Sequence, residues 1–282
     1  MERTLNFNSA RLAPSTRAED LAGQLQQREN LRSLQRRILS ILTPLFLLLI
    51  WETLARLSWI DTRFFPMPTK IAAEFWVLGS SGQLLNDVGV SLSRIVVGFL
   101  IGALPGLVIG LLMGQSPALR ACLNPIIASL YPIPKLAILP LILFIFGLGE
   151  ASKYVIIAIG VFFIVVVNTM TGSMSVPAIY LDVGREFGAS RLTLFRTIVL
   201  PAALPMIFAG IKLSWGTALL LMVAAEFVGA KSGIGYLIWN SWQVFSIEQM
   251  YVGLTMITFL GFVSLLLLDE LEQKVLPWRK YV

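Results

Sequence analysis

Six long apolar stretches are the feature that most limits what this chain can fold into. Each is close to the roughly 20 residues that a helix needs to cross a bilayer. Hydrophobic residues make up 56% of the 282 and charged residues only 13%, whereas a soluble domain carries about a quarter charged residues. The chain is therefore predicted to be an all-α integral membrane protein with about six transmembrane helices. The predicted spans are 38–58, 89–113, 123–146, 153–172, 202–227 and 248–268.

The third predicted span is the least regular. It is interrupted by Pro125, Pro132, Pro134 and Pro140. We expect its regular helix to begin only after Pro134, because a proline inside a helix removes a hydrogen bond and clashes with the preceding turn. Non-helical backbone at membrane depth is tolerated where it is buried in protein or lines a cavity. Residues 131–135 are therefore a candidate part of a translocation path.

The distribution of positive charge predicts the orientation. If the N-terminus is cytoplasmic, fourteen Lys and Arg residues lie inside and four lie outside. The inside residues are Arg3, Arg11, Arg17, Arg28, Arg32, Arg36, Arg37, Arg120, Arg185, Arg191, Arg196, Lys274, Arg279 and Lys280, and the outside ones are Arg63, Lys70, Lys153 and Lys231. By the positive-inside rule, both termini and the loop 173–201 are cytoplasmic in a bacterial-type plasma (inner) membrane.

The chain divides into a polar N-terminal segment, a transmembrane domain and a short tail. Residues 1–37 contain seven arginines and no apolar run, which excludes a secretory signal peptide in this segment. They are predicted to be a cytoplasmic arm or an amphipathic helix on the membrane surface. The transmembrane domain covers 38–276 and includes the cytoplasmic loop 173–201. Residues 277–282 form a cytoplasmic tail.

The composition excludes most enzyme classes. The chain has no histidine and a single cysteine, Cys122, which removes the commonest general base, His/Cys metal clusters and an intrachain disulfide. A phosphate-binding Walker A loop needs Gly directly before Lys, but Ala230 precedes Lys231. There is also no carboxylate pair at useful spacing and no serine in a nucleophile-elbow context. We therefore expect no catalytic residues, metal site or cofactor on this chain.

A glycine recurs every four residues along the second predicted span. The residues are Gly98, Gly102, Gly106, Gly110 and Gly114. At this spacing they form one nearly continuous stripe on a helix. Small residues allow helix backbones to approach closely in lipid, so the stripe predicts a helix-packing seam. A narrow wall of a translocation path is the alternative.

Ionisable residues inside predicted spans are candidate functional residues because they are costly in lipid. The candidates for a substrate path are Arg94, Lys135, Lys212 and Glu226. Three cations with few buried acids would attract an anion at low dielectric constant. The alternative is that Glu226, together with Glu52, pairs with the cations in structural salt bridges.

Residues 182–201 form a polar, basic insert between two apolar stretches. Residues 182–187 can form a short helix, and Gly188 offers the positive φ that ends helices cheaply. Ser190 can cap a second helix with apolar residues at helical spacing, and Pro201 suits the first turn of the helix that follows. The pattern predicts a helix-turn-helix finger between two spans, or else an ordinary amphipathic surface loop.

The frame of this insert, Gly188 followed by nine residues and Ile198-x-Leu200-Pro201, resembles the EAA loop of ABC-importer permeases. Asp182, Val183 and Gly184 stand where that family has Glu-Ala-Ala, and a glycine there should soften the helix by about 1 kcal/mol relative to alanine. In the family, the loop is a coupling helix that docks on a separate ATPase subunit. The resemblance implies coupling roles for Asp182, Arg185, Glu186, Gly188, Ala189, Leu200 and Pro201.

The resemblance covers approximately residues 40–276 and points to the nitrate/sulfonate/taurine/bicarbonate branch of these permeases. It is carried by Ser91-Leu-Ser-Arg94, Ile133-Pro-Lys-Leu-Ala137, Phe146-Gly-Leu-Gly-Glu150 and Ala225-Glu226 with Gly233-Ile-Gly235. It implies a type I importer permease fold and a two-fold dimer, formed with a second copy of this chain or with a different permease chain. The re-entrant segment 229–246 would then face an extracytoplasmic substrate-binding protein.

The function implied is that of the transmembrane permease subunit of an ATP-driven ABC importer for a small anionic solute, of the sulfonate/taurine, nitrate or bicarbonate class. ATP and Mg would bind on the partner ATPase subunits. Membrane lipid is a further expected partner, and nucleic acid is not. The alternative is an ion-coupled secondary carrier for a small anion, which would also use intramembrane charges but would need no ATPase.

Overall fold

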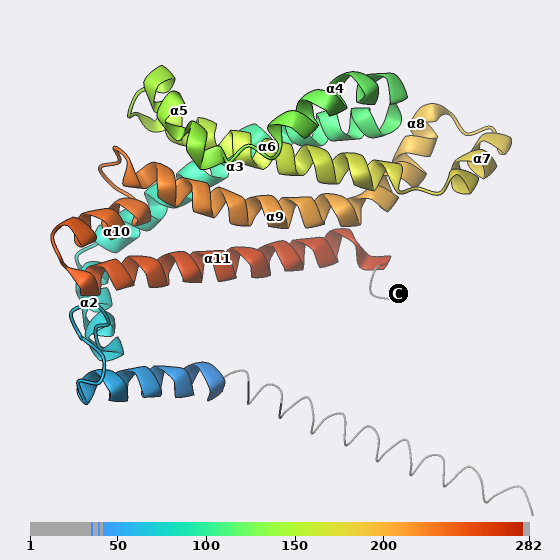
Figure 1. Ribbon diagram of the computed structural model, residues 1–282. Helices are drawn as coiled ribbons and strands as arrows, with labels where there is room; N and C mark the ends of the chain where they lie inside the picture. Colours follow the sequence, from blue (N-terminus) through green and yellow to red (C-terminus); the bar gives the residue numbers. More distant parts are fainter. Residues whose placement is uncertain (1–34, 36–38, 40–41, 279–282) are drawn as a thin grey trace, which may run out of the picture. The chain divides into compact units, whose positions relative to one another are not determined.

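The computed structural model describes residues 35, 39 and 42–278. All regular secondary structure among these residues is helical (Figure 1), which confirms the predicted all-α class. A boundary between Thr69 and Lys70 divides the chain into two compact units.

The first unit contains a helix over residues 42–56, which falls within the predicted span 38–58. Near its end, Glu52 accepts hydrogen bonds from the backbone N–H and the hydroxyl of Thr69, at 3.1 and 2.9 Å. Glu52 also pairs with Arg56 at 2.6 Å. These contacts tie the chain that leaves the helix back onto it. Apart from residue 35, the predicted arm 1–37 lies outside the described residues.

From α2 onward, helices follow one another with short connections. Their bounds are α2 (Pro68–Ser80), α3 (Gln83–Gln115), α4 (Pro117–Leu130), η1 (Lys135–Ile138), α5 (Leu139–Phe146), α6 (Glu150–Met174), α7 (Ala178–Glu186), α8 (Arg191–Leu194), η2 (Phe195–Val199), α9 (Leu200–Phe227), α10 (Ile234–Gln243) and α11 (Ile247–Val275). The segment η1 is a 3-10 helix, whereas η2 is a π-helical turn.

Four helical segments of the described chain are long and apolar enough to cross a membrane. They are Gln83–Gln115, Glu150–Met174, Arg191–Phe227 and Ile247–Val275, and each contains one of the predicted spans. A fifth candidate is the pair Pro117–Leu130 and Lys135–Phe146, whose two parts are bent by 84°. This pair contains the predicted span 123–146.

The bent pair corrects one expectation from the sequence. The prediction that regular helix begins only after Pro134 is wrong, because α4 is already helical, with Pro117 in its first turn and Pro125 inside it. The chain breaks instead at Pro132 and Pro134. Two prolines this close remove two N–H donors, and Pro134 disfavours the helical conformation at Ile133.

The core is a packed layer in which α6 lies against both α3 and α9, and Figure 1 shows these three long helices running alongside one another. Large apolar side chains fill the space between them. They include Ile95, Phe99, Ile156, Ile157, Val161, Val165, Leu221 and Met222. Because the hydrophobic effect does not drive the association of helices within lipid, van der Waals packing of this kind holds these spans together.

The glycine stripe of α3 faces α6. A Cβ built on Gly102 would lie 2.3 Å from the carbonyl oxygen of Ala158. A Cβ on any of the other four would lie between 2.4 and 3.1 Å from atoms of α6; these are Gly98, Gly106, Gly110 and Gly114. The two backbones therefore approach to a distance that a side chain at these positions would prevent.

We predict that Gly102→Ala destabilises the protein by about 1–3 kcal/mol, because the added methyl group meets a backbone oxygen that can move only if the helices separate. The matched control is Gly89→Ala on the same helix, where a Cβ would meet nothing within 4 Å. The control should unfold at the same temperature as the natural chain or slightly higher. Thermal unfolding in detergent measures both variants, and equal midpoints for the two would contradict the close packing.

Candidate functional site

Two polar regions of the second unit could carry function. The first is the segment between α6 and α9. Its first helix, α7, begins at Ala178, earlier than the expected Asp182, because Pro177 sets its start. Gly188 ends it with a φ of +74°, and the N–H of Gly188 donates to the Arg185 carbonyl at 2.9 Å. The expected stop is therefore present.

The second helix of this segment also starts where its sequence predicts. The Ser190 hydroxyl accepts a hydrogen bond from the N–H of Thr193 at 3.2 Å and caps α8. However, α8 is not a separate helix. It continues through the π-helical turn η2 into α9, and together they form one helical segment, Arg191–Phe227. Pro201 stands in the first turn of α9. We call residues 175–201 the finger, and its second arm is part of a membrane-spanning helix.

Gly184 has a packing role that the sequence did not reveal. A Cβ at this position would lie 2.4 Å from Cδ2 of Leu194 and 3.3 Å from Cδ1 of Ile198. Leu194 is buried. The glycine therefore lets the two helices of the finger approach closely, which compensates for its low helix propensity.

The exposed surface of α7 has an apolar stripe and a polar face. Ile179, Val183 and Phe187 lie four residues apart and are 62%, 47% and 87% exposed. Beside them, a groove of about 730 Å³ is bounded by α7, the start of α9 and Trp278. The polar face carries Asp182, which pairs with Arg185 at 2.8 Å.

The predicted coupling residues are distributed over both arms of the finger. Those in α7 and its turn are exposed, namely Asp182, Arg185, Glu186 and Gly188, whereas Ala189, Leu200 and Pro201 are half-buried. An exposed apolar stripe next to charged side chains is typical of a surface that binds another protein. The finger has the form expected of a docking element.

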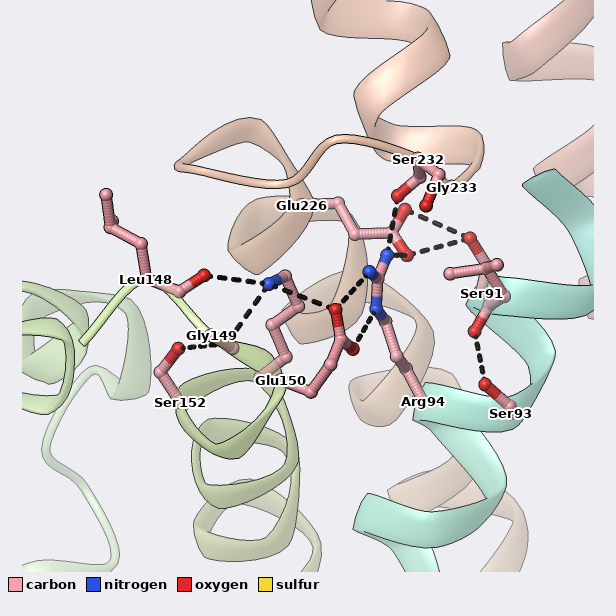
Figure 2. Close-up of polar contacts among 12 residues, drawn as sticks. Ser91, Ser93, Arg94, Leu148, Gly149, Glu150, Ser152, Glu226, Ser232 and Gly233 are labelled. Atoms are coloured by element: carbon pink, nitrogen blue, oxygen red, sulfur yellow. Dashed lines mark hydrogen bonds and ion pairs between the residues drawn. The ribbon is translucent and has the colours of Figure 1, made fainter. Parts of the chain in front are cut away.

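The second polar region is centred on the buried Arg94 (Figure 2). Its Nε and Nη2 atoms donate to the two carboxylate oxygens of Glu150 at 2.6 and 2.5 Å. Its Nη1 atom donates to Glu226 at 2.8 Å and to the carbonyl of Ser232 at 2.7 Å. The side chains of Arg94 and Glu226 are 3% and 0% exposed. One guanidinium thus joins α3, α6, α9 and the loop before α10.

Glu226 holds the start of α10 in place. Its carboxylate accepts hydrogen bonds from the Ser91 hydroxyl at 2.8 Å and from the N–H of Gly235 at 2.7 Å. A Cβ on Gly233 would lie 2.5 Å from the Glu226 carboxyl carbon, and Gly233 has a φ of +119°. Glycine is thus needed there both for space and for conformation.

The residues predicted to line a substrate path were Arg94, Lys135, Lys212 and Glu226. Of these four, the structure brings only Arg94 and Glu226 together. The Lys135 ammonium donates to the carbonyls of Leu130, Tyr131 and Ile133 at 3.0, 2.7 and 2.8 Å. The Lys212 ammonium instead pairs with two carboxylates of α11.

Those two carboxylates belong to Asp269 and Glu272. Arg94 and Lys212 therefore both take part in salt bridges between helices. The alternative named Glu226 and Glu52 as the acids, and it is right for the Arg94–Glu226 pair, whereas the acids that pair with Lys212 are different ones. Glu52 pairs within its own unit, with Arg56.

Sequence reasoning did not single out Glu150 or Asp87 as site residues. Asp87 accepts a hydrogen bond from the N–H of Gly233 at 2.8 Å. Asp87, Ser91 and Arg94 are four and three residues apart, so helical spacing alone places them on one face of α3. Glu150 belongs to a motif that carries the family resemblance, but no local spacing links it to Arg94, which lies 56 residues away.

Within the described residues, no group of three or more acidic or cysteine side chains could hold a metal ion.

Comparison with known protein families places most of the chain in one family. The family described as "Binding-protein-dependent transport system inner membrane component" matches residues 106–277.

Three relatives align along most of their own length. The putative aliphatic sulfonates transport permease protein SsuC of Bacillus subtilis (strain 168) is 36% identical, covering 85% of this chain and 87% of the relative. The taurine transport system permease protein TauC of Escherichia coli (strain K12) is 32% identical, covering 85% of this chain and 89% of the relative. The nitrate import permease protein NrtB of Leptolyngbya laminosa is 29% identical, covering 95% of both.

Among solved structures, a native crystal form of the MetNI methionine ABC transporter in inward facing conformations matches with a TM-score of 0.62. The match covers 70% of this chain and 98% of that one, at 19% sequence identity. At this identity the likeness shows the fold alone. The fold is that of a type I importer permease, as the resemblance implied.

We predict that Arg94→Gln destabilises the protein by about 3–5 kcal/mol, because it leaves the fully buried Glu226 carboxylate without its cation. Lys274→Gln is the matched control, since it removes a cation from an exposed pair with Glu270 on α11 and such pairs contribute little. Thermal unfolding in detergent should show a large loss for Arg94→Gln only. Similar midpoints for both variants would show that the buried network is not important for stability.

Proposed function

The chain belongs to the family of binding-protein-dependent transport system inner membrane components, and we propose that it forms the translocation path of an ATP-driven ABC importer for a small anionic solute. It is a multi-pass transporter subunit of the inner membrane rather than an enzyme. The names of its relatives support an aliphatic sulfonate, taurine or nitrate as the solute. Bicarbonate belongs to the same proposed class on the sequence resemblance.

The finger carries the proposal for a partner. Its exposed apolar stripe, Ile179, Val183 and Phe187, would dock on a separate ATPase subunit that binds ATP and Mg, because this chain has no Walker A sequence. Since α8, η2 and α9 are one helical segment, a displacement of the finger would tilt a membrane span directly. This is how closure of the ATPase would reach the translocation path.

The remaining partners follow from charge and symmetry. The excess of Lys and Arg on the finger side of the chain supports a cytoplasmic finger with both termini on the same side. A second copy of the chain would give each ATPase subunit a finger of its own and a symmetric path. The substrate-binding protein would dock at the opposite ends of the spans, near residues 229–246.

Among the proposed path residues, Lys135 is the one best able to attract an anion. Two carboxylates compensate Arg94, and two compensate Lys212. The hydrogen-bond acceptors of Lys135 are neutral carbonyls, and no carboxylate of the described residues forms a salt bridge with it at the break between α4 and α5. Arg94, Lys212 and Glu226 would contribute by holding the spans in position.

We predict that Phe187→Asp weakens binding of the ATPase subunit at least roughly 30-fold, because it places a charge at the most exposed side chain of the docking stripe. Phe245→Asp is the control, since Phe245 is also an exposed aromatic, at 83%, but lies beyond the other end of α9. Co-purification of the ATPase subunit, with thermal unfolding to show that the variants are folded, measures the effect. Full retention of the subunit by Phe187→Asp would refute docking through this stripe.

We predict that Lys135→Gln reduces uptake of the anion by proteoliposomes that contain the whole transporter and ATP, because the path loses its uncompensated charge. Lys274→Gln, which removes an exposed cation, should transport at the normal rate. Normal uptake by Lys135→Gln would remove Lys135 from the path. Uptake driven by an ion gradient, without the ATPase subunit, would favour the secondary carrier instead.

A further inference from the structure

A groove of about 1100 Å³ lies on the finger where it meets the C-terminal end of α3 and the start of α4. It is separate from the groove beside Trp278, and its lining includes apolar and basic side chains besides the polar Gln115 and Ser116. Val108 and Leu112 of α3 and Phe195 of η2 are apolar, whereas Arg185 and Arg191 carry guanidinium groups. Figure 1 shows α4, α7 and α8 at the same end of the long helices.

The charge of this groove is positive. The Nη1 atom of Arg185 donates a hydrogen bond to the carboxylate of Asp182. Arg191 forms no salt bridge with the carboxylates of the described residues. No acidic side chain lines the groove. Two guanidinium groups in one concave surface are well suited to a phosphate, since arginine donates to phosphate oxygens in a planar fork.

The apolar wall indicates what the phosphate would be attached to. Val108 and Leu112 are 57% and 51% exposed, and both belong to the membrane-spanning segment Gln83–Gln115. The groove therefore runs from the arginines onto an exposed apolar surface of a helix that is long and apolar enough to cross a membrane. A free anion would make no use of this wall, whereas the acyl chains of a lipid would cover it.

We propose that this groove binds an anionic glycerophospholipid of the surrounding membrane. Its phosphate would lie against Arg185 and Arg191, and its acyl chains would lie along Val108, Leu112 and Phe195. Basic pockets at the ends of transmembrane helices are a recognised way of binding anionic headgroups. The lipid would support the finger against the ends of α3 and α4. The proposal needs the finger to lie at a membrane face, but it does not depend on docking of the ATPase.

The test uses the purified full chain in a non-ionic detergent. Thermal unfolding is followed while dioleoylphosphatidylglycerol, dioleoylphosphatidylcholine or inorganic phosphate is added. Phosphatidylglycerol should raise the unfolding temperature in a saturable way, and the other two should not. Arg191→Gln should weaken the apparent affinity roughly fivefold, the effect of removing one basic residue near a lipid headgroup. Arg196→Gln is the matched control, because Arg196 is exposed on the same helical segment but does not line the groove.

Three results would overturn the proposal. An equal rise with phosphatidylcholine would mean that only the acyl chains matter, and an equal rise with inorganic phosphate would mean a site for free anions. An unchanged affinity of Arg191→Gln would place the lipid elsewhere. As a second measurement, native mass spectrometry should detect a phosphatidylglycerol adduct on the natural chain and on Arg196→Gln, and less of it on Arg191→Gln.

Discussion

Direct backbone contact between α3 and α6 is the constraint on which the rest of the second unit depends. The glycines of α3 allow a carbonyl such as that of Ala158 to lie where any other residue would place a side chain. Because α6 also packs on α9, this contact sets the positions of three spans. At one end of the spans, Arg94 can then reach Glu150 and Glu226 together.

The same three helices connect the buried network around Arg94 with the exposed finger. At one end, a fully buried guanidinium and its carboxylates hold the loop before α10. Buried ion pairs contribute little net stability compared with apolar packing, but the loss of one partner is strongly destabilising. At the other end, the exposed finger is continuous with α9. A single helical segment, Arg191–Phe227, therefore links a surface suited to a partner with a fixed buried network.

Much of the fold and the turn of the finger could be predicted from the sequence, because both depend on residues that are close together in the chain. Apolar length predicted the four long spans and the bent pair. Gly188 and Ser190 predicted the turn of the finger, since a positive φ and a helix cap depend on neighbouring residues. The start of regular helix in the bent pair was predicted wrongly. Proline count alone does not say where a helix breaks, whereas the close spacing of Pro132 and Pro134 does.

The sequence by itself determined the all-α membrane class, the glycine stripe and the frame of the finger, because hydrophobic length and helical spacing act over a few residues. Only the tertiary structure decided which carboxylates neutralise Arg94 and why a glycine stands at 184. It also decided that Arg185 and Arg191 share a groove with Val108. These contacts join residues far apart in the chain, so they depend on the packing of helices against one another, which no local pattern encodes.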